Sequence, residues 1–299
     1  MLRALGTAAE SVERLPLAEV DHRPWAYLDS LFVPPIDALV DLRHLEGVDV
    51  AHVLVPPALH EPVARALLER GIGVFVEKPL ALSSAAARAL SELASARGLA
   101  LGVNHNALHH PAFATVLARV RRGEIGRVEH VRACLSVPLR QLDAGDFSHW
   151  MFQTPRNIVF EQAVHPLAQI RELLGPVRRA ETTLLATREL SAGQPFHERW
   201  LVAAEAERGT LELYLAFGQG FTRNTLEILG SDGALEADLF HNLTSGERKT
   251  PWLDAFNSYM AGARRGSELR RSARRTLRQY LAFTLGLARR EDAFFAGMR

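Results

Sequence analysis

The stretch Val74-Phe75-Val76-Glu77-Lys78-Pro79-Leu80 decides the fold of the first half of the chain. It begins with β-branched and aromatic residues that predict a short buried strand, and Ser83-Ser84 then opens a helix. In a parallel α/β sheet, ligands bind at the carboxyl ends of the strands. The sequence therefore places Lys78, between Glu77 and the conformationally restricted Pro79, at a position suited to ligand chemistry.

The residues around this stretch repeat the alternation of strand and helix. Residues 48–55 and 99–103 have the continuous apolar pattern of buried strands. Helices are predicted over 60–70, with Pro62 in the first turn, and over 84–97. Strands that alternate with helices of this size are joined by right-handed crossovers, so they predict a parallel, doubly wound sheet.

The part of the chain before residue 45 gives a weaker pattern. We expect a helix over 1–13, a strand over 17–20 that ends at Asp21, and a helix over 35–45. No strand with a G-x-G-x-x-G turn precedes them. The first domain is therefore expected to be a Rossmann-like α/β domain that lacks its first strand.

The second half of the chain has a different pattern. A loop over 138–156 leads to a helix over 158–174, for which Asn157 is the candidate cap. The other predicted elements are helix 111–122, strands 128–136, 179–187, 199–205, 210–217, 224–229 and 234–239, and helix from residue 251 onward. Because no helix separates the later strands, they indicate an open, mainly antiparallel sheet in an α+β domain. We place the first domain at 1–106 and the second at 107–299.

The composition excludes several classes of protein. With 47% hydrophobic and 23% charged residues the chain is typical of a globular protein, and 35 basic against 34 acidic residues give no field that attracts nucleic acid or an anionic membrane. The basic clusters at 119–122 and 264–278 are interpreted as solvated helix faces. Cys134 is the only cysteine, which excludes an internal disulfide and a cysteine-based zinc site. Since neither a leading secretory segment nor an apolar run of about twenty residues is present, we expect a cytoplasmic protein.

Glu161 and His165 form the second candidate for chemistry. They lie four residues apart in the predicted helix and therefore on one face of it. A histidine exchanges a proton with a substrate hydroxyl near neutral pH, and a carboxylate one turn away orients it. The alternative is a surface pair that stabilises the helix by a few tenths of a kcal/mol.

Polar residues at two further places are candidates to line a binding cleft. Asn104-His105-Asn106 follows the strand at 99–103, and His149, Trp150 and Arg156 lie in the loop before the helix of His165. The histidines and Glu161 are of the types that bind metals, but no tight pattern such as H-E-x-x-H is present. The sequence therefore predicts no metal site.

Taken together, these residues resemble the Gfo/Idh/MocA family of nicotinamide-dependent oxidoreductases. The pieces that match are Val55-Pro56-Pro57-Ala58-Leu59-His60, the run from Gly73 to Ser83, Gly102-Val103-Asn104-His105-Asn106 with Pro111, and Gly123-Glu124-Ile125-Gly126-Arg127-Val128. The resemblance extends in order over about residues 48 to 240. It implies a nucleotide-binding α/β domain followed by a substrate domain with an open sheet.

The resemblance also implies roles for individual residues. Lys78 matches a lysine that touches both nicotinamide and substrate, His165 matches an acid/base histidine, and Glu161 matches a positioning carboxylate. The residues expected to contact NAD or NADP are Pro56, Pro57, His60, Glu77, Lys78, Asn106 and Asp21. Those expected to contact substrate are His105, His149, Trp150 and Arg156.

The chain departs from the family pattern at the site and at both ends. Glu161 stands where the family has aspartate and Ala163 where it has glycine, and the extra methylene shifts the carboxylate enough to change substrate geometry. Relative to the family, the chain is expected to be shortened at both the N- and the C-terminus. Without the glycine-rich turn, the pyrophosphate of a dinucleotide loses its usual backbone contacts.

The expected function is hydride transfer between NAD(P) and a hydroxyl or carbonyl carbon of a sugar, polyol or related small molecule. Two alternatives remain at this point. One is a lyase or hydrolase that uses the same lysine and histidine without a redox step. The other is a truncated, cofactor-free protein that binds a ligand or a partner chain. A homo-oligomer formed through the C-terminal sheet is expected, with no nucleic-acid or membrane partner.

Overall fold

The computed structural model describes residues 45, 47–190, 193–248, 250 and 254–287. These residues form two compact units that meet in sequence between Asn104 and His105. The elements predicted before residue 45, together with Asp21, lie outside the described residues.

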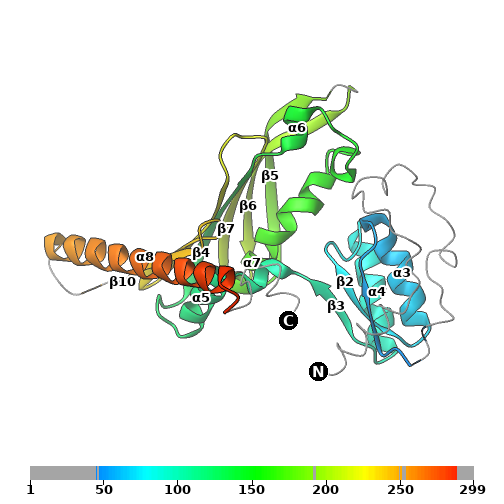
Figure 1. Cartoon of the computed structure of the whole chain (residues 1–299), viewed down its shortest axis with the longest axis horizontal. Coiled ribbons are helices and arrows are strands. Elements are labelled where there is room, and N and C mark those ends of the chain that lie inside the picture. Colours follow the sequence, from blue (N-terminus) through cyan, green and yellow to red (C-terminus); the bar gives the residue numbers. More distant parts are fainter. Residues whose placement is uncertain (1–44, 46, 191–192, 249, 251–253, 288–299) are drawn as a thin grey trace. The chain divides into compact units, whose positions relative to one another are not determined.

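The first unit contains a parallel sheet, as predicted. Its elements are β1 (Val50–Val53), α3 (Pro57–Glu69), β2 (Gly73–Glu77), α4 (Ser84–Ala96) and β3 (Leu101–Asn104). Within the described residues the strand order is β1-β2-β3, and Val76 of β2 lies opposite Val53 on one side and Val103 on the other. Helix α3 packs against both the sheet and α4 (Figure 1). The carboxyl ends of all three strands therefore lie at one end of the unit, which is where α/β sheets bind ligands.

The helix boundaries in this unit follow from local signals, with one correction. Ser83 caps α4, because its hydroxyl accepts a hydrogen bond from the backbone N–H of Ala86 at 3.2 Å. The prediction for α3 was wrong at its start: the helix begins at Pro57 and Pro62 lies inside it. Pro57 supplies the favourable first-turn proline that was assigned to Pro62.

The second unit is built on a seven-stranded sheet. Its strands are β4 (Val128–Val137), β5 (Val177–Glu189), β6 (Pro195–Ala206), β7 (Gly209–Phe217), β8 (Arg223–Gly230), β9 (Gly233–Asp238) and β10 (Leu243–Arg248). Their order in space is β10-β9-β8-β4-β7-β6-β5, and every pair is antiparallel except β4 with β7. The mainly antiparallel sheet is confirmed, whereas β10 was not predicted.

Helices cover one face of this sheet. They are η2 (Asn106–His109), α5 (Pro111–Arg121), α6 (Arg140–Ala144), η3 (Trp150–Phe152), η4 (Val159–Ala163), α7 (Val164–Leu174) and, along β10, α8 (Asp254–Thr284). The fully buried Phe113 of α5 and Ile170 of α7 pack on inward residues of the strands such as Val131 and Leu213. The opposite face is polar, and Arg132 there pairs with both Glu212 and Glu227. The prediction of an irregular loop over 138–156 was wrong, since it contains α6 and η3.

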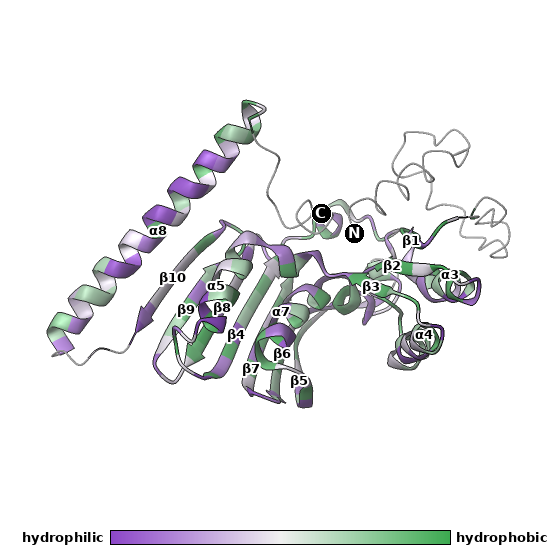
Figure 2. Cartoon of the chain, turned by 90° about the horizontal axis from the view of Figure 1, so that it is seen from below, coloured by the Kyte–Doolittle hydropathy of each residue, from purple (hydrophilic) through white to green (hydrophobic). Residues whose placement is uncertain are grey.

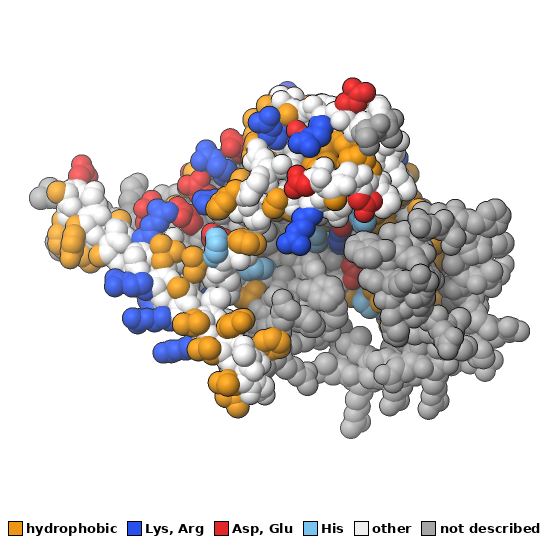
Figure 3. All heavy atoms as spheres, turned by 45° about the horizontal axis from the view of Figure 1, so that its top comes forward, with side chains coloured by type: hydrophobic (Ala, Val, Ile, Leu, Met, Phe, Trp, Pro, Cys, Tyr) orange, Lys and Arg blue, Asp and Glu red, His pale blue; other side chains and the backbone are white. Residues whose placement is uncertain are grey.

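Helix α8 is largely exposed. It mixes hydrophilic and hydrophobic residues along its length (Figure 2). Basic and apolar side chains both reach its surface (Figure 3). Its exposed large apolar side chains are Phe256, Tyr259, Met260, Leu277, Tyr280, Leu281 and Phe283. No helix in the part of the chain that the structure describes is long and apolar enough to span a membrane.

Arg119 links α8 to the rest of the unit. Its guanidinium donates to both carboxylate oxygens of Glu124, at 3.0 and 2.6 Å, and to Oε2 of Glu268 in α8 at 3.0 Å. The Arg119 side chain is only 11% exposed. The hydrogen bond from Arg119 holds the pKa of Glu124 below its ordinary value, and the same contact raises the pKa of Arg119.

Replacing Glu124 with glutamine is expected to lower the free energy of unfolding by about 2 kcal/mol at pH 7, the usual scale for a hydrogen bond to a charged group. Because the pKa of Glu124 is depressed in the folded state, its stabilisation is present above the unfolded pKa and is lost as the pH falls through the folded pKa. The difference in free energy of unfolding between wild type and Glu124→Gln should therefore shrink as the pH falls below about 4.5. Urea unfolding at pH 7, 5 and 3 measures this difference.

A matched control is Glu181→Gln, which removes a carboxylate from the exposed pair with Arg179, both side chains being 70% exposed. Exposed pairs contribute little, so this variant should unfold like the wild type at pH 7. If the difference in free energy of unfolding between wild type and Glu124→Gln stays constant from pH 7 to pH 3, the role given to the Glu124 carboxylate is contradicted.

Candidate functional site

The carboxyl end of β2 carries the first group of candidate residues. Glu77 ends the strand, and Lys78 and Pro79 follow it. The peptide bond between Lys78 and Pro79 is cis. The Nδ2 atom of Asn104, which ends β3 and is buried, donates a hydrogen bond to Oε1 of Glu77 at 2.6 Å. The same carboxylate oxygen lies 3.8 Å from Nε2 of His52 in β1. One carboxylate thus joins the ends of three parallel strands directly beside Lys78.

His60 contacts this turn through a ring nitrogen. Its ring is 1% exposed, and its nitrogens lie 2.6 Å from the carbonyl oxygen of Pro79 and 2.8 Å from that of Val55. The imidazole therefore connects the turn after β2 to the turn after β1, where Pro56 and Pro57 are partly exposed. His60 thereby fixes the Lys78–Pro79 turn. The direct contact of His60 with a cofactor stays a prediction.

Trp150 and Glu161 form the centre of the candidate site in the second unit. The indole Nε1 of Trp150 donates a hydrogen bond to Oε2 of Glu161 at 2.9 Å. Trp150 is itself fixed, because its carbonyl oxygen accepts a hydrogen bond from Nδ2 of Asn157 at 2.8 Å. Asn157 also accepts a hydrogen bond from the Thr154 hydroxyl at 2.7 Å, and it is buried. The prediction that Asn157 caps the helix was wrong; its side chain holds the Trp150 loop.

Glu161 and His165 lie on either side of a change in helix type. Residues Val159–Ala163 form a π-helical turn, and α7 begins at Val164. Glu161 therefore belongs to the wider turn and His165 to the first turn of the α-helix, and both side chains are partly buried. Single π-turns inside helices are frequent at functional sites. The sequence predicted one regular helix here and missed this feature.

His105 opens the second unit beside the short helix η2. Its Nδ1 is buried and has no hydrogen-bond partner within the described residues. Burial, with a smaller contribution from the positive charge of Arg171, lowers the pKa of His105 below its ordinary value. Gln169 of α7 donates from Nε2 to the carbonyl oxygen of Ala107 at 2.8 Å and so fixes η2. Gln169 was not predicted. The sequence signal for it is a polar residue on a helix face that is otherwise apolar, and the structure shows that Gln169 is buried there.

The remaining predicted site residues of the second unit lie beside η3 and in η2. His149 caps η3, since its Nδ1 accepts a hydrogen bond from the backbone N–H of Met151 at 3.3 Å. Arg156 is exposed, and Asn106 is partly buried at the start of η2. In the described ranges no group of three or more His, Cys, Asp or Glu side chains is arranged to hold a metal ion.

Comparison with known protein families gives two adjacent matches. Residues 11–105 match the profile described as "Oxidoreductase family, NAD-binding Rossmann fold", and residues 113–236 match the "GFO/IDH/MocA C-terminal domain". The first match includes Lys78 and the second includes Glu161 and His165. Together they cover the chain from 11 to 236 apart from seven residues, 106–112.

Individual relatives are similar over only part of their length. The chain is 28% identical to dTDP-3,4-didehydro-2,6-dideoxy-alpha-D-glucose 3-reductase of Streptomyces violaceoruber, over 71% of this chain and 60% of that protein. It is 27% identical to scyllo-inositol 2-dehydrogenase (NAD(+)) of Bacillus subtilis, over 52% of this chain and 42% of that protein. The structure of an inositol dehydrogenase homolog complexed with NAD+ from Azotobacter vinelandii shares the fold, with a TM-score of 0.60 and 20% identity, over 69% of this chain and 56% of the other.

Proposed function

Since the chain belongs to the Gfo/Idh/MocA family of oxidoreductases, we propose that it transfers a hydride between a nicotinamide dinucleotide and a hydroxyl or carbonyl carbon of a sugar, polyol or related small molecule. The proposal is supported by relatives named as a sugar-nucleotide reductase and an inositol dehydrogenase. The chain spans about half of the length of these relatives.

The single observation that carries this proposal is the environment of Lys78. Lys78 directly follows β2, and Glu77 beside it is held by Asn104. The chain has only two lysines among its 35 basic residues, so arginine serves at nearly every other cationic position. An ammonium group is compact and changes protonation more readily than a guanidinium. A lysine kept at this strand end therefore suits polarisation of a substrate oxygen.

The residues of the second unit complete the proposed chemistry. In the oxidative direction His165 would take the proton of the substrate hydroxyl whose carbon gives up the hydride. Glu161, oriented by the indole N–H of Trp150, positions the substrate and the imidazole. We further assign His105, His149, Trp150 and Arg156 to substrate binding. These assignments are proposals that rest on the family pattern and on the contacts within the second unit.

The residues present at the strand ends fit a dinucleotide cofactor. Three parallel strands end together, and polar groups of Glu77, Lys78 and Asn104 gather there, as in sheets that bind nucleotides. We assign Pro56, Pro57, Glu77, Lys78 and Asn106 to holding the cofactor, which supplies the carbon that accepts or releases the hydride. Asp21, the candidate contact to the ribose, lies outside the described residues.

Titration with NADH and, separately, with NADPH tests the proposal. We expect saturable enhancement of nicotinamide fluorescence with at least one of them, and oxidation of that cofactor in the presence of a keto-sugar or keto-polyol. Binding without hydride transfer across such a panel would support the lyase or hydrolase alternative. No binding in a sample that is folded by circular dichroism would contradict the proposal.

We also propose that the chain forms a homo-oligomer through the sheet of the second unit. The support is the face opposite α5 and α7, where Arg132 and its partners remain about half exposed. Light scattering on the full chain measures the mass, and a monomer at micromolar concentration would contradict this assignment.

A further inference from the structure

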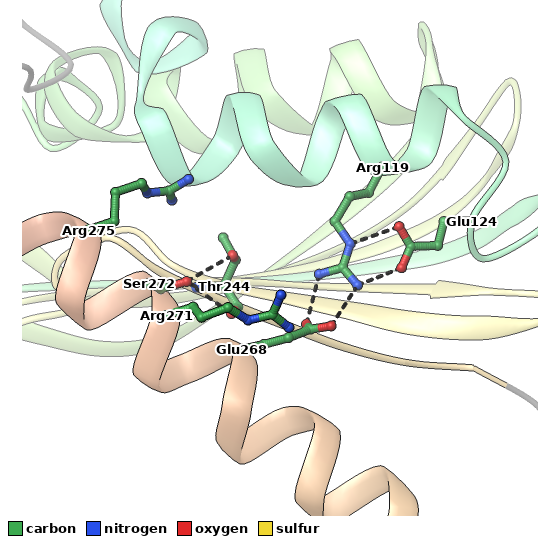
Figure 4. A pocket seen from close by; sticks show the side chains of 7 residues that line it. All are labelled: Arg119, Glu124, Thr244, Glu268, Arg271, Ser272 and Arg275. Atoms are coloured by element: carbon green, nitrogen blue, oxygen red, sulfur yellow. Dashed lines mark hydrogen bonds and ion pairs between the residues drawn. The ribbon is translucent and has the colours of Figure 1, made fainter.

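An open hollow lies between α5, β10 and α8 (Figure 4). Its volume is about 360 Å³, within the range of roughly 300–1,000 Å³ that small-molecule sites occupy. It is lined by Arg119, Glu124, Thr244, Glu268, Arg271, Ser272 and Arg275. Three guanidinium groups against two carboxylates give the lining a net charge of +1.

The two carboxylates of the hollow share the guanidinium of Arg119. Glu124 and Glu268 both accept hydrogen bonds from Arg119, which forms one wall. Gly246 in β10 makes room for this wall, because a Cβ atom there would lie 2.6 Å from Nη2 of Arg119. Arg119 is therefore occupied by the protein itself, and the excess positive charge belongs to α8.

Arg271 and Arg275 supply that excess charge. They lie one turn apart on α8, and neither side chain makes an ion pair or hydrogen bond to another residue in the part of the chain that the structure describes. The buried hydroxyls of Thr244 and Ser272 lie 3.3 Å apart at the base of the hollow. Figure 4 shows this hydroxyl pair between the side chains of Arg271 and Arg275.

We propose that this hollow binds the phosphoryl group of a small molecule. Paired guanidinium groups match the oxygens of a phosphate with charge-assisted hydrogen bonds. The hydroxyls at the base are hydrogen-bonded to each other and to the Thr244 backbone, so they form a polar floor beneath the two guanidinium groups. The cluster at 264–278, interpreted from the sequence as a solvated helix face, thereby acquires a specific role at Arg271 and Arg275.

The phosphoryl site is separate from the proposed reaction site. Arg119 lies near the carboxyl end of α5, and Arg121 at that end pairs with Glu172 near the carboxyl end of α7 at 2.5 Å. His165 lies in the first turn of α7, at the opposite end of that helix. The proposal therefore does not depend on the proposed oxidoreductase function.

Inorganic phosphate is the probe for the test, added to the full chain in exchange for chloride at constant ionic strength. We expect the thermal unfolding temperature to rise saturably with phosphate, since a ligand that binds only the folded state stabilises it. The double variant Arg271→Ala with Arg275→Ala should raise the apparent dissociation constant at least about tenfold. The matched control is Arg270→Ala with Arg274→Ala, which removes two charges from neighbouring positions of α8 outside the lining and should change that constant less than about twofold.

Three results would overturn the proposal. One is an unfolding temperature of the wild type that does not respond to phosphate. Another is an equal weakening of phosphate binding in the control variant. The third is tight binding of a short DNA duplex to the wild type together with an equal loss of DNA affinity in the two double alanine variants. That result would assign α8 to polyanion binding. The pair Arg271→Lys with Arg275→Lys, which keeps the charge and loses the fork geometry, should bind phosphate with intermediate affinity if the site is as proposed.

Discussion

Replacing Lys78 with alanine is expected to lower kcat for hydride transfer by about 10²- to 10³-fold, the scale of removing one group that stabilises developing charge on an oxygen. The physical reason is the role proposed for Lys78, which follows β2 next to the Glu77–Asn104 hydrogen bond: its ammonium group is assigned to polarising the reacting oxygen. The measurement is steady-state oxidation of NADH, or of NADPH, with the carbonyl substrate that the panel identifies.

The conservative variant sharpens this test. Lys78→Arg keeps the positive charge but replaces a compact ammonium with a broad planar group, so we expect it to restore less than a tenth of the lost rate. The control is Arg70→Ala, which removes an exposed cation one residue beyond α3. Near-normal turnover in Lys78→Ala, with cofactor binding unchanged, would show that Lys78 is not a catalytic residue.

Replacing His165 with alanine is expected to lower kcat by about 10²- to 10⁴-fold, the usual contribution of a positioned general acid or base. Because the loss concerns proton transfer, the rate of the variant should also lose the dependence on acidic pH that an imidazole base produces. The measurement is the pH profile of kcat/KM from pH 5 to 9 for wild type and variant.

The exposed His109, at the end of η2, is the matched histidine for this comparison, and His109→Ala should keep both the rate and the pH profile of the wild type. Titration of NADH into His165→Ala separates chemistry from binding, since cofactor affinity should be retained. A variant with wild-type kcat and an unchanged acidic limb would remove His165 from the mechanism.

The first unit could be predicted from the sequence because its signals are local. A β-branched run predicts β2, and Ser83 with the following apolar spacing predicts α4. The strand end at Lys78 follows from these two elements alone. Pro62 misled the prediction because a proline is favourable in a first turn, and Pro57 satisfies that preference five residues earlier.

The second unit was predicted less well where contacts between distant residues decide the structure. Strand β10 is short and polar, so no apolar alternation reveals it, and it forms by pairing with β9 and packing on α8. The π-turn at Glu161 has no hydrophobic pattern that distinguishes it from an α-helix, so the sequence does not reveal it. Arg119 and Glu268 are 149 residues apart, so no pattern of spacing shows that they meet. The loop of Trp150 was flagged for its aromatic and polar residues, but its hydrogen bond to Glu161 became visible only in three dimensions.

Strand β5 has a consequence for how the protein behaves at high concentration. It is thirteen residues long, it is outermost in its sheet, and nearly all of its side chains are exposed. Such a strand is a template on which another molecule adds by main-chain pairing, the first step toward fibrils. Arginines and glutamates along it, together with irregular register against β6 near Val177 and Ala186, oppose that growth. We therefore expect these charges, which contribute little to folding, to slow the growth of amyloid-like aggregates at high protein concentration.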